Sequence, residues 1–115
     1  MILVDTPIWS LALRRRPHDL NPGEERHVRE WERLRAALRP FPDLPITTDH
    51  YEWAAQAFNR CRAKGIAGSA IDLIICAVSG AYGAPIYTTD VDFRRYTTVL
   101  KLKLHVPRTR PQDSE

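Results

Sequence analysis

Four aspartates in this sequence have contexts typical of metal-binding side chains: Asp5, Asp72, Asp90 and Asp92. Asp5 ends a short apolar run, and Asp90 and Asp92 follow a second one, so both runs are predicted strands. The carboxyl ends of parallel strands meet at one edge of a sheet. Carboxylates that converge there repel one another unless a cation lies between them, and Mg²⁺ and Mn²⁺ take such oxygen ligands. Taken singly, Asp5 also suits a helix N-terminus, and Asp90 and Asp92 suit turns.

Asp72 is the only charged residue between Gly65 and Tyr87. Burying an unpaired carboxylate is costly, and no Lys or Arg lies within a helical turn of it. A purely structural explanation is that Ser69 caps a helix, so that the Asp72 carboxylate bonds back to the cap and meets the helix dipole. The two interpretations are compatible, because a capping aspartate can also face a metal.

The elements that must position these side chains alternate between strands and helices. The predicted strands are residues 2–4, 44–47, 85–88 and 99–106, and the predicted helices are 7–13, 24–39, 49–64 and 69–82, with a loop at 17–23 and a helical turn at 92–96. Thr6, Asp49 and Ser69 are the predicted caps, and Gly65 ends a helix. Segments 44–47 and 99–106 are expected at sheet edges. This alternation predicts an α/β fold with a mostly parallel sheet.

The composition fits one globular domain. The chain has 115 residues, of which 43% are hydrophobic and 27% charged, and that length can bury a core without metal or disulfide staples. Residues 1–106 are the expected domain, and residues 107–115 a disordered tail. Residues 70–84 are too short to span a bilayer, and the N-terminus lacks the pattern of a signal peptide. We therefore expect a cytoplasmic protein with no membrane partner.

The net charge of +3 comes with two basic runs, residues 14–16 and 94–110, and the second holds six Lys or Arg and no acidic residue. Such runs could flank a phosphate backbone or simply form solvated faces. Tyr96 suits either the core or a base-stacking surface. Cys61 and Cys76 are expected to be buried free thiols. The histidines lack metal-ligand spacing and are expected at the surface or in loops: His18, His27, His50 and His105.

Three segments together resemble the PIN-domain ribonucleases, above all the VapC toxins of bacterial toxin–antitoxin pairs. Residues 1–9, MILVDTPIW, resemble the family's opening, an apolar strand followed by Asp, Thr or Ser, and Trp. Residues 69–77, SAIDLIICA, resemble its central acidic helix. Residues 86–93, IYTTDVDF, resemble its closing strand with the pattern T-x-D-x-D-F. The three segments occur in the family's order.

This resemblance implies a three-layer α/β fold, with a mostly parallel central sheet flanked by helices. It also implies an Mg²⁺- or Mn²⁺-dependent endoribonuclease, the toxin of a toxin–antitoxin pair. In that picture Asp5, Asp72 and Asp90 are catalytic and hold the metal, with Asp92 near it. The metal lowers the pKa of a bound water and stabilises charge on the scissile phosphate. The implied partners are RNA, a VapB-like antitoxin and a second copy of the chain in a homodimer.

The sequence departs from the family pattern at one place. The family carries a Glu after a second strand, in a phrase like E-L/I-L-x-G, whereas residues 31–38 run directly from an early helix into a later one. None of the glutamates of this sequence stands in that context, so we assign the role of the family's Glu to none of them: Glu24, Glu25, Glu30, Glu32 and Glu52. One strand and one helix of the full fold are therefore expected to be missing. This loss should weaken metal binding and expose an apolar edge beside the first strand, which favours dimerisation or instability.

Two other functions stay open at this point. The first is a catalytically inactive PIN-like module that binds RNA or an antitoxin. The second is a flavodoxin-like phosphoacceptor domain built around one aspartate. The second lacks the expected buried lysine, because Lys101 and Lys103 lie in an alternating, exposed pattern.

Overall fold

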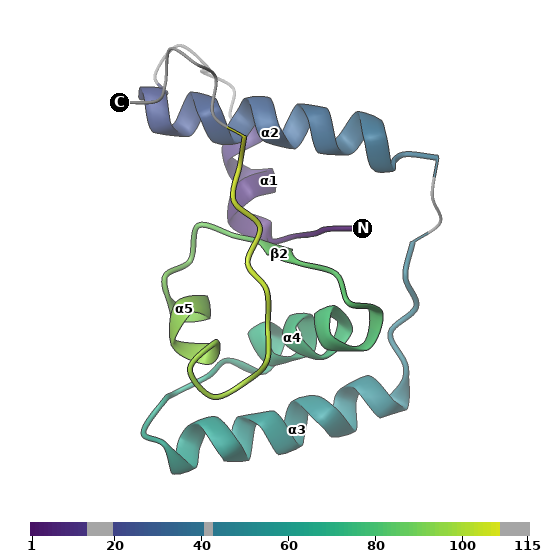
Figure 1. Ribbon diagram of the computed structural model, residues 1–115, viewed down its shortest axis with the longest axis vertical. Coiled ribbons are helices and arrows are strands. Elements are labelled where there is room, and N and C mark those ends of the chain that lie inside the picture. The colour runs from purple at the N-terminus through teal and green to yellow at the C-terminus, as the bar shows by residue number, and fades with distance from the viewer. Residues whose placement is uncertain (14–19, 41–42, 109–115) are drawn as a thin grey trace.

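The computed structural model describes residues 1–13, 20–40 and 43–108. Its elements follow in the order β1 (Leu3–Val4), α1 (Thr6–Ala12), α2 (Pro22–Leu38), α3 (Thr48–Ala63), α4 (Ala70–Tyr82), β2 (Ile86–Tyr87) and α5 (Asp92–Tyr96) (Figure 1). None of the helices in these ranges combines the length and apolar composition needed to cross a bilayer.

The sheet is parallel and β2 lies at its centre. On one side β2 pairs with β1, with Leu3 opposite Ile86 and Val4 opposite Tyr87. On the other side residues 103–105 run parallel to β2 and join Ile86 through two backbone hydrogen bonds of 2.8 and 2.9 Å. The carboxyl ends of β1 and β2 therefore meet at one edge, as the sequence predicts.

The two residues of β2 belong to different cores because successive strand residues face opposite sides of a sheet. Ile86 packs with α3 and α4, where the buried side chains include Ala57, Cys61, Leu73 and Cys76. Tyr87 packs with Ile8 of α1 and with Trp31 and Leu34 of α2. Helices thus cover both faces of the sheet, with α1 and α2 above it and α3 and α4 below it in Figure 1. The predicted three-layer α/β arrangement is confirmed.

Helix α4 begins where its cap predicts. The Ser69 Oγ accepts a hydrogen bond of 3.1 Å from the Asp72 N–H, which satisfies one of the free amides of the first turn. Gly83 ends α4 with a φ of +64°, and Gly65 follows α3 with a φ of +76°. Both are backbone conformations that favour glycine.

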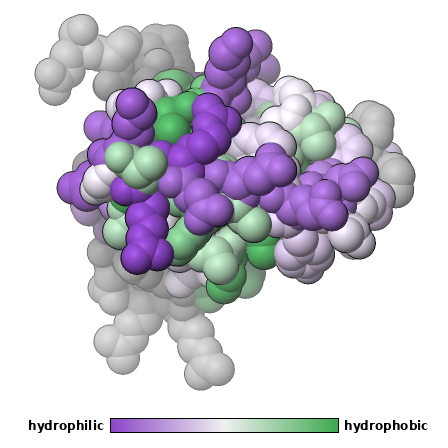
Figure 2. Space-filling view, turned by 90° about the horizontal axis from the view of Figure 1, so that it is seen from below, coloured by the Kyte–Doolittle hydropathy of each residue, from purple (hydrophilic) through white to green (hydrophobic). Residues whose placement is uncertain are grey.

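Figure 2 shows hydrophilic side chains gathered on the face of the molecule on which α3 lies.

Three other helix starts differ from the prediction. Asp5, not Thr6, caps α1, because its Oδ1 accepts the Thr6 N–H at 2.9 Å. Helix α2 begins at Pro22 rather than residue 24, since Asn21 and Glu24 form a reciprocal capping box. Helix α3 begins at Thr48, so the prediction of Asp49 as its cap is wrong.

Of the two predicted edge strands, the one at 44–47 is wrong and the one at 99–106 pairs with β2 only at residues 103–105. Residues 44–47 form no strand and connect α2 to α3. In the segment 99–106 only Leu104 forms a bridge, because the N–H groups of Val99 and Leu100 bond back to the Tyr96 carbonyl and prolong the turn of α5. Of the expected tail the structure describes residues 107 and 108, and the basic run 14–16 lies outside the described residues.

The outer side of β1 carries no further strand in the ranges that the structure describes. Between α2 and α3 the structure describes residues 39–40 and 43–47, which form no strand and no additional helix. The described residues thus form an α/β fold with no further strand or helix at the place where the sequence lacks the segment bearing the family's Glu.

Candidate metal centre

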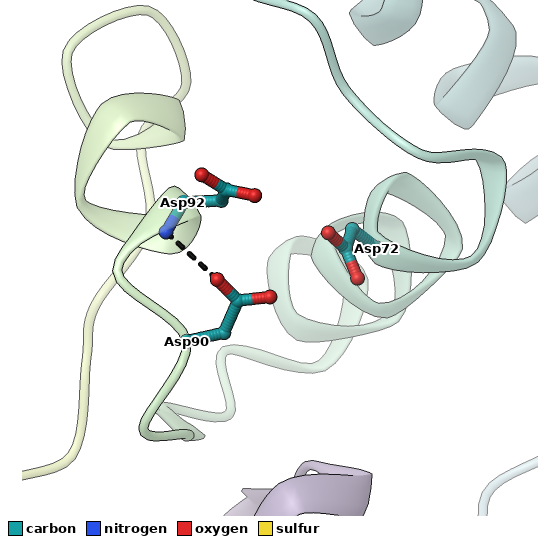
Figure 3. A group of neighbouring side chains, drawn as sticks. All are labelled: Asp72, Asp90 and Asp92. Atoms are coloured by element: carbon teal, nitrogen blue, oxygen red, sulfur yellow. Dashed lines mark hydrogen bonds between the residues drawn. The ribbon is translucent and has the colours of Figure 1, made fainter.

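Three of the four predicted aspartates form one acidic group. Carboxylate oxygens of Asp72, Asp90 and Asp92 lie within 4.8 Å of one another, and all three residues are half-buried. Figure 3 shows Asp72 on α4, Asp90 on the segment that leads into α5 and Asp92 at the start of α5, with the carboxylates directed toward a common space. Segments far apart in the sequence thus place three negative charges together.

Two successive side-chain turns fix the segment after β2. Thr88 follows β2 directly, and its Oγ1 accepts a hydrogen bond of 3.0 Å from the Asp90 N–H. The Asp90 Oδ1 in turn accepts one of 2.9 Å from the Asp92 N–H, the dashed line in Figure 3. Such turns are a common use of Thr and Asp side chains, and here they hold both carboxylates on the side that faces α4.

Asp72 is held from the other side of the group. The Tyr96 hydroxyl, on a residue only 1% exposed, donates a hydrogen bond of 2.9 Å to the Asp72 Oδ2. Burial raises the pKa of Asp72, the carboxylates of Asp90 and Asp5 raise it further, and hydrogen bonds from Tyr96 and Ser69 partly oppose this shift. The charged form of Asp72 is thus disfavoured first by burial and then by its acidic neighbours.

Asp5 is not a member of the acidic group. It is only 7% exposed, and both of its carboxylate oxygens accept hydrogen bonds. Oδ1 accepts the Thr6 N–H at 2.9 Å, and Oδ2 accepts the Thr88 hydroxyl at 2.7 Å. Because Thr88 also accepts from Asp90, Asp5 supports the acidic group through one intermediate side chain.

The residues present fit a hard divalent cation. All the ligand atoms offered are carboxylate oxygens, the type that Mg²⁺ and Mn²⁺ prefer. A cation among them would relieve the repulsion from Asp90 and Asp5 that adds to the effect of burial on the Asp72 pKa. No glutamate of the described part of the chain belongs to the group. The site therefore offers three carboxylates and a supporting aspartate, without the glutamate of the family pattern.

Sequence reasoning missed two residues that position this group. Thr88 carried one available signal, because a Thr two residues before an Asp at a strand end is typical of a side-chain turn. Tyr96 carried none, since its partner Asp72 lies 24 residues away. The expectation of surface or loop histidines is wrong for His50, which is on α3, 7% exposed, and accepts the Thr47 N–H.

Exposed cationic side chains follow the acidic group along the chain. Arg94 and Arg95 lie two and three residues after Asp92 in α5, and Lys101 and Lys103 lie further along the chain, all four exposed. Exposed cationic side chains can neutralise a phosphate backbone while carboxylates bind a metal. The geometry is thus compatible with a nucleic-acid substrate.

The two cysteines are buried free thiols, as predicted. Cys61 and Cys76 are both 0% exposed and form no disulfide. Burial, and to a lesser degree the Asp72 carboxylate, raises the pKa of Cys76 to about 12. This thiol is therefore protonated at neutral pH and is not a nucleophile.

Comparison with known families supports what the geometry indicates. Residues 8–99, most of the chain, match the PIN domain, and the match includes the acidic group but begins after Asp5. None of the curated proteins compared with the chain is significantly similar to it. PIN domains are generally nucleases that use divalent metals. The match to this family replaces the alternative of a flavodoxin-like phosphoacceptor domain. This chain belongs to the PIN-domain family.

Proposed function

We propose that this protein is an Mg²⁺- or Mn²⁺-dependent endoribonuclease and acts as the toxin of a VapC-type toxin–antitoxin pair. The observation that carries the proposal is the convergence of the Asp72, Asp90 and Asp92 carboxylates at the carboxyl edge of a parallel sheet in a PIN domain. The toxin role rests on the resemblance of the three sequence segments to VapC proteins. RNA is the proposed substrate and a VapB-like antitoxin the proposed inhibitor.

Each residue of the site has a distinct task in this proposal. Asp72, Asp90 and Asp92 would hold the cation, and the Tyr96 hydroxyl keeps one Asp72 oxygen fixed. The cation, when bound, lowers the pKa of a water and offsets charge developing on the scissile phosphate. Arg94, which is exposed on α5, would contact the neighbouring phosphates of the strand.

A second candidate is a PIN module that binds RNA or an antitoxin without cleaving RNA. The observation that favours it is the composition of the site. No described glutamate joins the acidic group, and Asp5 uses both oxygens in hydrogen bonds to Thr6 and Thr88. With fewer ligands, the cation would bind more weakly and activity would be low.

Cleavage of a fluorescent RNA by the full chain separates the two candidates. The assay compares Mg²⁺, Mn²⁺ and EDTA for the wild type, for Asp72→Asn and for Asp49→Asn, a matched control in the exposed first turn of α3. The proposal expects metal-dependent cleavage that Asp72→Asn abolishes and Asp49→Asn preserves. Folded wild-type protein that binds RNA but leaves it intact in every metal would favour the binding module. Equal cleavage by the wild type and Asp72→Asn would refute the proposed site.

A further inference from the structure

The last turns of α3 are joined to the turn that follows α5 (Figure 1). The Arg60 Nη2 on α3 donates a hydrogen bond of 3.0 Å to the Val99 carbonyl, although the two residues are 39 positions apart. Val99 belongs to the turn after α5, because its N–H donates to the Tyr96 carbonyl. This bond brings two segments that are distant in the sequence onto one surface.

Both segments carry exposed cationic side chains at this place. Lys64 is the C-cap of α3 and follows Arg60 by four residues, so the two side chains lie on the same side of the helix. Lys101 follows Val99 by two residues, which keeps its Cα within about 7 Å of the Val99 Cα. Arg60, Lys64 and Lys101 are all exposed. Cationic groups from α3 and from the chain after α5 therefore lie near one another.

The two segments contain no acidic residue that could offset this charge. Neither residues 53–71 nor residues 93–108 include an Asp or a Glu. The acidic residues of α3, Asp49 and Glu52, belong to its other end, and Glu52 lies about 12 Å from Arg60 along the helix axis. This end of α3 is thus a positively charged surface, and an anionic partner suits it.

Helix α5 connects this surface to the acidic group. It has five residues and is about 7 Å long, with Asp92 at its start and the turn with Val99 beyond its end. Arg95 is exposed and lies three residues after Asp92, so both side chains belong to the same side of α5. Exposed cationic side chains therefore extend from the acidic group toward the end of α3.

This arrangement suits a phosphate backbone better than an acidic protein. A nucleic-acid strand carries one charge at each nucleotide, so successive phosphates can contact a row of separated cations. The row begins beside carboxylates that suit a divalent cation, and such a cation binds a phosphate oxygen as well. An acidic polypeptide would compete with those carboxylates for the cation instead of being held by it.

We infer that Arg60, Lys64, Arg95 and Lys101 form a basic surface that binds the RNA backbone several nucleotides away from the acidic group. The inference rests on the proposed function, because the same RNA strand would occupy both places. It adds a contact of the substrate with α3, which belongs to neither basic run of the sequence. Arg62 takes no part, because it lies about 200° around α3 from Arg60, with the fully buried Cys61 between them.

Removing charge from this basic surface tests the inference by fluorescence anisotropy on the full chain. The probe is fluorescent oligouridylate of about 16 nucleotides, titrated in EDTA so that binding is measured apart from metal-dependent cleavage. Lys64→Ala with Lys101→Ala is expected to weaken binding about tenfold at low salt. The slope of log affinity against log salt should become shallower by about 0.7 for each lysine removed. Lys64→Arg with Lys101→Arg keeps both charges and should bind like the wild type.

The matched control is Arg62→Ala with Arg39→Ala, which removes the same charge from exposed positions outside the basic surface. It is expected to retain the affinity and the salt slope of the wild type. Circular dichroism establishes that each variant is folded before its binding is compared.

Three results would overturn the inference. The first is an alanine pair at Lys64 and Lys101 that binds oligouridylate like the wild type. The second is a control pair that weakens binding equally, since net charge alone would then explain the affinity. The third is polyglutamate that displaces the RNA at equal charge concentration, which would assign the surface to an acidic protein. Wild-type protein that binds RNA through the two lysines but never cleaves it would refute the proposed nuclease and support the basic surface.

Discussion

The hydroxyl of Tyr96 donates a hydrogen bond of 2.9 Å to the Asp72 carboxylate. Tyr96 ends α5 and Asp72 lies in the first turn of α4, so this bond ties together the two helices that build the acidic group. Burial and the Asp72 carboxylate raise the pKa of Tyr96, so the phenol stays protonated and remains a donor. The orientation of Asp72 is therefore fixed by a neutral, fully buried partner.

Replacing Tyr96 by Phe tests this relationship. The change removes one hydrogen bond and keeps the ring, which costs about 1 kcal/mol of the free energy of unfolding. We expect the affinity for Mn²⁺, measured by titration calorimetry, to fall about tenfold or more, as it does when groups that orient metal ligands are lost. Tyr87→Phe is the matched control, because Tyr87 is 0% exposed and its hydroxyl contacts His27 at 2.7 Å. Equal Mn²⁺ affinities for the two variants would contradict a positioning role for Tyr96.

Thr88 offers a second test because its hydroxyl joins Asp5 to the Asp90 backbone. Thr88→Val keeps the shape of the side chain and removes both bonds, so the free energy of unfolding in urea should fall by about 1–3 kcal/mol. RNA cleavage should fall roughly 10- to 100-fold if the proposed function is correct. Thr88→Ser retains the hydroxyl and should restore most of both quantities. Failure of the serine variant to recover activity would mean that the methyl group, not the hydroxyl, is what the site requires.

Much of this site could be predicted from the sequence because its signals are local. Asp5 and Asp90 each follow an apolar run, and Ser69 stands three residues before Asp72, so strand ends and a cap are visible in the chain itself. Parallel pairing of β1 and β2 then brings these positions to one edge. What the sequence placed imprecisely was Asp5, whose oxygens are taken by Thr6 and Thr88 rather than directed into the acidic group.

The rest depends on contacts between distant residues or on competition between local structures. The bond between Tyr96 and Asp72 spans 24 residues and follows only from the packing of α5 against α4. The alternation of Leu and Lys in 99–106 predicts a strand. However, the backbone N–H groups of Val99 and Leu100 donate to the Tyr96 carbonyl at the end of α5 instead. Residues 44–47 have strand composition but pair with no strand of the described residues.

Glu30 shows a further long-range arrangement, with a consequence for stability against acid. Its side chain is only 3% exposed. The carboxylate accepts hydrogen bonds from the Arg33 Nε at 2.6 Å and from the Arg108 N–H at 3.0 Å. The His105 Nε2 forms a third hydrogen bond with it, at 2.7 Å. Burial alone would raise the pKa of Glu30, but these hydrogen bonds lower it from 4.5 to about 2. Helix α2 and the segment after residue 103 are thus joined through one ionised carboxylate.

The stability from Glu30 should be present above the unfolded pKa and disappear as the pH falls. A lowered folded pKa means that the unfolded chain takes up the proton first, so the contribution is lost between about pH 4.5 and about pH 2. The shift corresponds to about 3 kcal/mol at neutral pH. Glu30→Gln should therefore unfold at a lower urea concentration at neutral pH, and its free energy of unfolding should fall less as the pH is lowered. Glu52→Gln, exposed on α3, should match the wild type in both. Parallel acid curves for the wild type and Glu30→Gln would rule out this role.

The thermal stability of Asp72→Asn, with and without Mn²⁺, should show whether Asp72 stabilises the fold or binds the metal. Because burial and the carboxylates of Asp90 and Asp5 raise the Asp72 pKa, its charged form destabilises the metal-free fold at neutral pH. Removing that charge is expected to raise the thermal midpoint without metal. Saturating Mn²⁺ should then stabilise the wild type, by about 3 kcal/mol at a hundred times the dissociation constant, and leave Asp72→Asn unchanged. A variant that is less stable than the wild type without metal, yet still stabilised by Mn²⁺, would mean that Asp72 holds the fold together rather than the cation.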